Sequence, residues 1–176
     1  MTLKNNLRKI ALEKRKLLDC NKLSNKIMQN LTSLPKYKES KHIISYSPLK
    51  YEVDTRYCNQ DKTKDIYLPR VNGDNLDICP CSDLCKGSFG ILEPQSSAII
   101  DYSYIDMVLI PACAVDKNGY RLGYGKGFYD RFLPLLPANC LKVVLIFSEL
   151  LFDTVYPDKY DVKSDIIITE KEIIKT

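Results

Sequence analysis

The sequence predicts one α/β domain, with a mostly parallel central sheet flanked by helices, and three observations support this. The chain has 176 residues, and one hydrophobic core usually serves roughly 100 to 200 residues. Two amphipathic stretches come before the first strand candidate, and several of the strand candidates are continuously apolar. Strands that are covered by helices on both faces have this pattern. We therefore expect residues 1–176 to form a single domain.

The N-terminal part is expected to form two helices. Leu3, Leu7 and Ile10 recur at helical spacing with Lys and Arg between them, which predicts a helix from about residue 2 to 19. The run DCN at 19–21 interrupts this pattern. Ser24 is the expected N-cap of the second helix, which should end before Pro35.

Five short apolar or β-branched runs are the expected strands. They lie at 42–46, 65–69, 105–112, 141–147 and 165–169, and such runs between turn signals are typical of buried strands. The segment between Val71 and Ser103 is rich in Asn, Asp, Gly, Pro, Cys and Ser, so its strand signal is the weakest in the chain.

Composition indicates a soluble globular protein. Hydrophobic residues make up 45% of the chain and charged residues 27%, with 26 basic residues against 22 acidic ones; disordered chains are less hydrophobic. No run of about 18 apolar residues is present, and the N-terminus has no apolar signal core. We expect a cytoplasmic protein, and a net charge of +4 suits an anionic small molecule as well as nucleic acid.

The cysteines are expected to be free thiols. There are seven, an odd number, in a chain without a secretory signal. Cys79, Cys81 and Cys85 are close in sequence, but C-x-C-x-x-x-C has no paired C-x-x-C, and the only histidine, His42, is far away. Zinc is therefore not expected, and His42, at the start of a strand, is expected to be structural.

The clearest functional signal is GYRLGYGKGFYD, from Gly119 to Asp130. It follows a buried strand candidate and precedes a short helical run, so its backbone N–H groups would lie at a helix N-terminus, which favours an anion. Gly123, Gly125 and Gly127 alternate along it, and glycines allow the backbone to approach a phosphate group closely.

The side chains around these glycines favour a phosphate loop over a simple strand-to-helix turn. Arg121, Lys126 and Arg131 supply three cations, and Asp130 supplies a carboxylate of the kind that holds magnesium beside phosphates. The pattern matches neither the Walker motif, nor the dinucleotide fingerprint, nor the kinase loop. It therefore predicts a different phosphate loop.

These residues resemble the signature of the 5-formyltetrahydrofolate cyclo-ligase family, also called 5,10-methenyltetrahydrofolate synthetases. The run PACAVDKNGYRLGYGKGFYDRFL contains R-L-G-x-G-K-G-[FY]-Y-D, a highly specific motif. The similarity extends over nearly the whole chain, through K-x-x-L-R at 4–8, E-V-D-T at 52–55, L-P-R at 68–70, G-I-L-E-P at 90–94 and Y-D-V-K-S-D at 160–165.

The resemblance implies an enzyme of folate one-carbon metabolism. Its reaction would be the ATP- and Mg²⁺-dependent cyclisation of 5-formyltetrahydrofolate to 5,10-methenyltetrahydrofolate, with release of ADP and phosphate, through a phosphorylated formyl intermediate. The expected partner is this small-molecule folate, with or without a polyglutamate tail. Nucleic acid, a membrane and an obligate protein partner are not expected.

The resemblance also implies the site residues. The implied ATP-binding residues form two segments: Lys4, Asn5, Asn6, Leu7 and Arg8, and then Arg121, Leu122, Gly123, Tyr124, Gly125, Lys126, Gly127, Phe128 and Tyr129. Those implied to bind folate are Glu52, Ser47, Tyr124, Gly125, Lys126, Gly127 and Phe128, although Ser47 departs from the apolar residue that is common there. We assign the catalytic roles to Lys126 and Arg121, which would neutralise charge on the triphosphate.

Asp130 and Asp165 are the implied magnesium ligands. One opens a helix and the other a strand, positions that can meet at one end of a parallel sheet, where ligands gather. Lys4 and Arg8 are four residues apart, so they share a helix face and can reach one anion.

Two other functions are compatible with the residues considered without the resemblance. One is a different phosphate-substrate enzyme on the same scaffold, such as a sugar-phosphate isomerase or a CoA transferase, since fold does not determine chemistry. The other is a basic module that binds a nucleic-acid backbone through Lys4, Arg8 and the glycine loop.

Overall fold

A seven-stranded sheet forms the centre of the protein, as seen in a computed structural model that describes residues 2–87, 90–96 and 98–176. The strand order is β12-β11-β9-β6-β1-β2-β3. These strands are β1 (His42–Ile44), β2 (Asp65–Asn72), β3 (Asn75–Pro80), β6 (Met107–Ile110), β9 (Leu141–Leu145), β11 (Ile166–Ile168) and β12 (Ile173–Lys175). The five inner strands pair in parallel, whereas β3 and β12 are antiparallel at the two edges. The predicted α/β class and mostly parallel sheet are confirmed.

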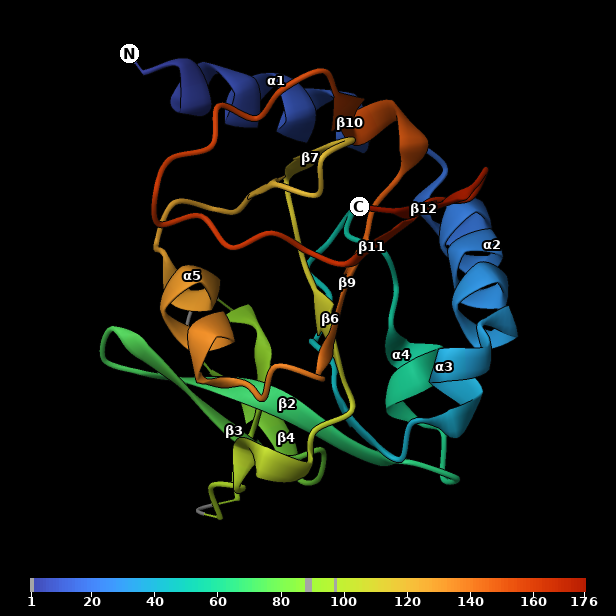
Figure 1. The fold of residues 1–176 in the computed structure, drawn as a ribbon, viewed down its shortest axis with the longest axis vertical. Coiled ribbons are helices and arrows are strands. Elements are labelled where there is room, and N and C mark those ends of the chain that lie inside the picture. The colour runs from blue at the N-terminus through green and yellow to red at the C-terminus, as the bar shows by residue number, and fades with distance from the viewer. Residues whose placement is uncertain (1, 88–89, 97) are drawn as a thin grey trace.

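Helices flank this sheet on both sides (Figure 1). They are α1 (Leu3–Lys16), α2 (Cys20–Ser33), α3 (Pro35–Glu39), α4 (Arg56–Asn59) and α5 (Phe128–Phe132). In Figure 1, α2, α3 and α4 lie on one side of the sheet, α5 lies on the other, and α1 crosses above it. The two predicted N-terminal helices are therefore present.

The prediction that Ser24 caps the second helix is wrong. The N-cap is Asp19, whose side chain accepts a hydrogen bond from the Lys22 N–H, so α2 begins at Cys20. Helix α1 ends at Lys16, with Leu17 as its C-cap, and does not reach residue 19. Ser24 is buried inside α2, where its hydroxyl accepts a hydrogen bond from the Asp54 N–H at 3.0 Å.

The segment with the weakest strand signal contains further strands. Besides β3, it contains a hairpin of β4 (Leu84–Lys86) and β5 (Leu92–Pro94).

A small sheet of order β10-β7-β8 is built from β7 (Ala114–Asp116), β8 (Arg121–Leu122) and β10 (Leu151–Phe152). Within the described residues, short 3₁₀ helices span Tyr102–Tyr104, Leu133–Leu135 and Ser148–Leu150.

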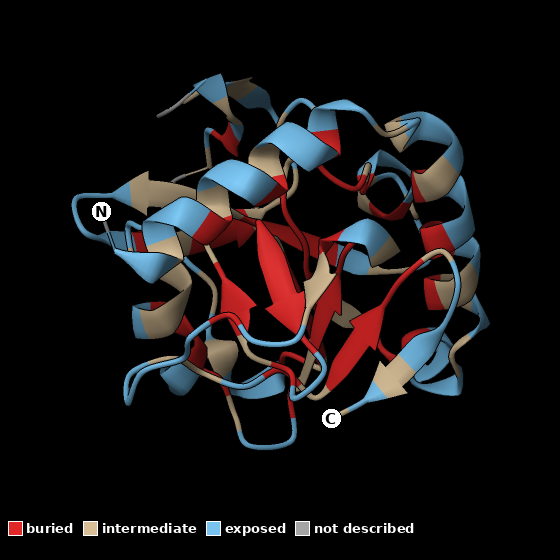
Figure 2. Ribbon diagram, turned by 90° about the horizontal axis from the view of Figure 1, so that it is seen from above, coloured by how far each residue is buried: buried red, intermediate tan, exposed pale blue. Residues whose placement is uncertain are grey.

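The core consists of the central strands and the helix faces that cover them, as the buried residues in Figure 2 show. All four residues of β6 are fully buried, as are Ile43 and Ile44 of β1. Their continuous apolar runs arise because helices or loops exclude water from both sheet faces. The order of the strands leaves the loops that follow β1 and β6 side by side at the carboxyl end of the sheet.

Two further sequence expectations concern cysteines and membranes. All seven cysteines are free thiols, and residues 2–87, 90–96 and 98–176 contain no cluster of three or more His, Cys, Asp or Glu side chains that could hold a metal ion. Within the same residues, no helix has the length and apolar character needed to cross a bilayer.

Candidate active site

A cavity of about 520 Å³ lies at the carboxyl end of the sheet. Tyr46 and Pro111, which follow β1 and β6, form part of its wall. The other walls come from α1, the β2–β3 hairpin, the glycine loop and a loop before β11. Ligands bind at this end of open α/β sheets because the strand-to-helix loops meet there.

The glycine loop, residues 121–130, forms one side of the cavity. It turns at Gly125, with φ of 95°, and at Gly127, with φ of 69°, the residue that caps α5. Only glycine adopts such positive φ values without strain. All of the loop residues predicted to bind ATP line the cavity: Arg121, Leu122, Gly123, Tyr124, Gly125, Lys126, Gly127, Phe128 and Tyr129.

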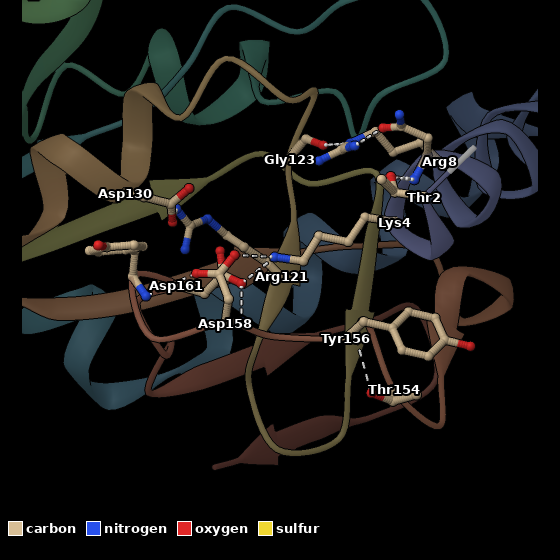
Figure 3. A network of polar contacts seen from close by, with 12 residues as sticks. Thr2, Lys4, Arg8, Arg121, Gly123, Asp130, Thr154, Tyr156, Asp158 and Asp161 are labelled. Atoms are coloured by element: carbon tan, nitrogen blue, oxygen red, sulfur yellow. Dashed lines mark hydrogen bonds and ion pairs between the residues drawn. The ribbon is translucent and has the colours of Figure 1, made fainter.

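Helix α1 is attached to this loop by Arg8. The Arg8 Nε donates to the Gly123 carbonyl at 2.7 Å, and its Nη1 donates to Asn5 Oδ1 at 2.6 Å (Figure 3). A Cβ at Gly125 would lie 3.5 Å from Arg8 Cζ, so the two are in close contact. The helix and the loop therefore form one wall.

Only two of the five residues predicted on α1 line the cavity. Lys4 and Arg8 face it from the same side of the helix, as their four-residue spacing predicts. Asn5 contacts it indirectly, by accepting the Arg8 hydrogen bond. Asn6 is exposed, and Leu7 is buried in the core.

Arg121 and Asp130 form an ion pair in the cavity wall. The Arg121 side chain, only 3% exposed, donates through Nη2 to Asp130 Oδ1 at 2.7 Å and through Nη1 to the Val162 carbonyl at 2.9 Å. Such a pair holds the guanidinium in one geometry, with its charge beside the loop.

Two carboxylates that the sequence analysis did not select, Asp158 and Asp161, lie close to this pair (Figure 3). Both bind the Lys4 ammonium, whose Nζ is 2.6 Å from Asp161 Oδ2 and 2.9 Å from Asp158 Oδ2. Burial by itself would lower the pKa of Lys4, but these two carboxylates outweigh it and raise the pKa. This arrangement already stabilises a cation between Asp158 and Asp161.

The structure does not bring the two predicted magnesium ligands together. Asp130 lines the cavity, whereas Asp165 lies at the amino end of β11, where its carboxylate accepts from the Lys142 N–H at 2.8 Å. A residue that opens a parallel strand lies at the end of the sheet opposite to the cavity, and this is why the expected meeting fails. Another carboxylate that lines the same cavity as Asp130 is Asp161.

Glu52, which also lines the cavity, is buried and bound on both oxygens. Its Oε2 accepts from the Leu49 N–H at 2.7 Å, and its Oε1 accepts from the Tyr124 hydroxyl. Burial raises the pKa of Glu52, and the hydrogen bonds from Tyr124 and Leu49 and the nearby Arg15 charge oppose this. Ser47, also predicted to bind substrate, lines the cavity.

The remaining wall is apolar and was not found from the sequence. It consists of Pro69, Val71, Leu76 and Ile91, with the buried carboxylate of Glu93 among them. An apolar wall that carries a few polar groups is typical of sites for flat organic ligands. The cavity thus has a charged half around the glycine loop and a largely apolar half around Glu52 and β2–β3.

Replacing Glu52 with glutamine is expected to change how the stability of the folded protein depends on pH. Because burial raises the pKa of Glu52 above its ordinary value of 4.5, the folded state binds this proton more tightly than the unfolded chain. Stability is therefore lost as pH rises from about 4.5 through the raised folded pKa, by about 1.4 kcal/mol for each unit that separates the two pKa values.

Glutamine does not ionise and avoids this loss. The Tm of Glu52→Gln relative to that of the wild type should therefore be higher at about pH 7 than at about pH 4. The same difference in Tm at both pH values would contradict this assignment.

Comparison with known proteins identifies the family of the chain. Residues 1–170 match the model of the 5-formyltetrahydrofolate cyclo-ligase family. The chain is 32% identical to the 5-formyltetrahydrofolate cyclo-ligase of Mycoplasma pneumoniae, over 96% of this chain and 99% of that protein. It thus spans almost the full length of this relative.

Solved structures give the same result. The NMR structure of Aquifex aeolicus 5,10-methenyltetrahydrofolate synthetase superimposes with a TM-score of 0.88, at 36% identity over 99% of this chain and 93% of that one. A 5,10-methenyltetrahydrofolate synthetase from Mycoplasma pneumoniae superimposes with a TM-score of 0.78, at 29% identity over 96% of this chain and 99% of that one. The chain belongs to the 5-formyltetrahydrofolate cyclo-ligase family.

Proposed function

We propose that this cyclo-ligase closes the ring of 5-formyltetrahydrofolate to 5,10-methenyltetrahydrofolate at the expense of ATP, with Mg²⁺, and releases ADP and phosphate. The observation that carries this proposal is the cavity itself, in which a glycine loop with fixed cations faces an apolar half with a buried carboxylate. A triphosphate suits the first half, and a reduced pterin suits the second.

The triphosphate would bind against the glycine loop and α1. Backbone N–H groups around Gly125 and Gly127 can point at phosphate oxygens, and Lys4, Arg8 and Lys126 line the same part of the cavity. Arg121 is held in place by Asp130 and the Val162 carbonyl. Fixed cations of this kind stabilise the charge that develops when a phosphoryl group is transferred.

The carboxylates of Asp130 and Asp161 are the groups that would hold Mg²⁺. This ion prefers oxygen ligands and commonly takes one or two carboxylates together with substrate phosphates. The position of the Lys4 ammonium against Asp161 supports the fit, because that carboxylate already binds a positive charge. Bound there, Mg²⁺ would neutralise phosphate charge.

The folate would bind in the apolar half, beside Glu52. A carboxylate accepts hydrogen bonds through about four lone-pair positions, and in Glu52 the Leu49 N–H and the Tyr124 hydroxyl use two of them. The remaining positions can accept from the amino and ring N–H groups of a pterin. Ser47 and the wall of β2–β3 would enclose the rings.

The chemistry solves the problem of a formyl amide, whose carbon is a poor electrophile and whose oxygen is a poor leaving group. The formyl oxygen attacks the terminal phosphorus of ATP, and ADP departs. The second folate nitrogen then attacks the activated carbon, loses its proton, and phosphate leaves with the former formyl oxygen. The protein contributes position and charge neutralisation, and no histidine is needed for these steps.

The test is to mix purified protein with 5-formyltetrahydrofolate, Mg²⁺ and ATP and to follow the methenyl chromophore together with ADP. We expect one ADP for each methenyl product, and no product when ATP is omitted. Formation of product without ATP would contradict the proposal, as would the absence of any ATP-dependent absorbance change. ATP consumption also separates this function from a sugar-phosphate isomerase or a CoA transferase, whose reactions need none.

A further inference from the structure

The hydroxyl of Tyr124 joins the two halves of the cavity. Tyr124 belongs to the glycine loop and is 41% exposed as a residue, but its hydroxyl reaches across to Glu52. That hydroxyl donates to Glu52 Oε1 and accepts from Arg15 Nη1, at 2.9 Å. One side chain of the phosphate loop is therefore bound to the carboxylate on the folate side.

Arg15 is an unusual residue to find at this position. It lies on α1, is only 5% exposed, and its Nε is buried without a hydrogen-bond partner in the described part of the chain. A buried guanidinium with incomplete hydrogen bonding costs stability. Arg15 contacts Tyr124 in two ways. Its Nη1 donates to the Tyr124 hydroxyl, and its Cζ lies 5.7 Å from the centroid of the Tyr124 ring. The contact with Tyr124 explains why Arg15 is buried here, because Arg15 holds the Tyr124 side chain in position.

Two further contacts hold the loop: Arg8 Nε donates to the Gly123 carbonyl at 2.7 Å, and Arg131 Nη2 donates to the Lys126 carbonyl at 3.0 Å. Its tip nevertheless faces solvent. Tyr124, Gly125 and Lys126 are all exposed residues. Ordering such a loop around a triphosphate costs conformational entropy, and a contact that has already ordered the loop lowers this cost for the next ligand. Glu52, held by folate, would present a fixed acceptor to the Tyr124 hydroxyl.

We infer that Tyr124 is a positioning residue that couples the two substrates, so that folate bound at Glu52 orders the glycine loop and raises the affinity for ATP. Coupling of this kind is reciprocal, so ATP raises the affinity for folate by the same factor. Arg15 is the second member, since it holds the hydroxyl from the other side. This inference rests on the proposed function, because it assumes that both substrates bind this cavity.

The test is a thermodynamic cycle on wild type, Tyr124→Phe and Tyr57→Phe. The dissociation constant of a non-hydrolysable ATP analogue is measured with and without 5-formyltetrahydrofolate, and the ratio of the two gives the coupling factor. Tyr57 lies on α4, is 70% exposed and does not line the cavity. Tyr57→Phe is therefore the matched control, because it also removes one tyrosine hydroxyl but does so outside the cavity.

In the wild type and in Tyr57→Phe we expect the analogue to bind about 5- to 150-fold more tightly when folate is present. In Tyr124→Phe the factor should fall toward one, while each substrate alone still binds. Arg15→Lys keeps the positive charge but loses the planar guanidinium with its fixed donors. Its coupling factor should lie between those of the wild type and Tyr124→Phe. Hydrogen exchange supplies a second readout: folate alone should slow amide exchange in residues 121–129 of the wild type, and Tyr124→Phe should lose this protection.

The outcomes separate this inference from the proposed function. Wild-type protein that forms the methenyl product but has a coupling factor of one would overturn the inference alone, as would an unchanged factor in Tyr124→Phe. Wild-type protein that binds neither ligand would overturn both.

Discussion

Replacing Lys126 with methionine is expected to lower kcat by about two to three orders of magnitude, the usual cost of removing one group that stabilises charge in the transition state. Lys126 lies at the tip of the glycine loop, between the two glycines with positive φ, and lines the charged half of the cavity. Methionine keeps most of the apolar length of lysine and removes the ammonium. The steady-state rate of methenyl formation at saturating ATP measures the effect.

The control for this variant is Lys117→Met. Lys117 is also exposed and precedes the same loop by a few residues, but it does not line the cavity. It should keep the wild-type rate, and both variants should unfold at nearly the wild-type temperature, because an exposed lysine buries little surface. A Lys126→Met enzyme with wild-type kcat would remove this residue from the catalytic machinery.

Replacing Asp161 with asparagine is expected to raise the Mg²⁺ concentration for half-maximal activity by at least about tenfold, whereas Asp165→Asn should leave it unchanged. Asp161 lines the cavity with Asp130, and Asp165 lies at the opposite end of the sheet. The two substitutions are chemically identical and four residues apart. Asp130 is the less clean choice, because its loss would also leave the buried Arg121 charge without its ion pair.

The measurement is a magnesium titration of activity at fixed ATP for the three proteins. The structural assignment would be reversed if Asp165→Asn weakened the Mg²⁺ dependence and Asp161→Asn did not. A second check is Mn²⁺, which also prefers oxygen ligands and should show the same order of effects.

The central sheet could be predicted because strands that are buried on both faces consist of continuous apolar residues. Val143 and Val144 in β9, like Met107 and Val108 in β6, are fully buried and belong to continuous apolar runs. Strand β3 shows why the rest was weaker: its residues are mixed polar and apolar, and it is held by antiparallel pairing with β2. That pairing depends on tertiary contacts, which the β-propensities of the individual residues do not reveal.

The site was predicted where its chemistry is contiguous in sequence and was missed where it is dispersed. The glycine loop carries the residues predicted to bind phosphate in one segment, and residues 121–130 all line the cavity. Asp161 and Asp165 belong to one motif, and spacing alone could not decide which of them faces the ligand. Glu93 belongs to the G-I-L-E-P motif at 90–94, but the motif gave it no role. Arg15 gave no signal, because a single charged residue has no periodicity and acquires a role only through its neighbours in space.

Helix α1 closes the site from the far end of the chain. Its contact from Lys4 reaches Asp158, 154 residues later, and its contact from Arg8 reaches Gly123, 115 residues later. Contacts between such distant segments form late, because closing a long loop costs entropy before the contacts repay it. On the ribosome, these contacts of α1 with the site therefore cannot form until Gly123 and Asp158 have been synthesised.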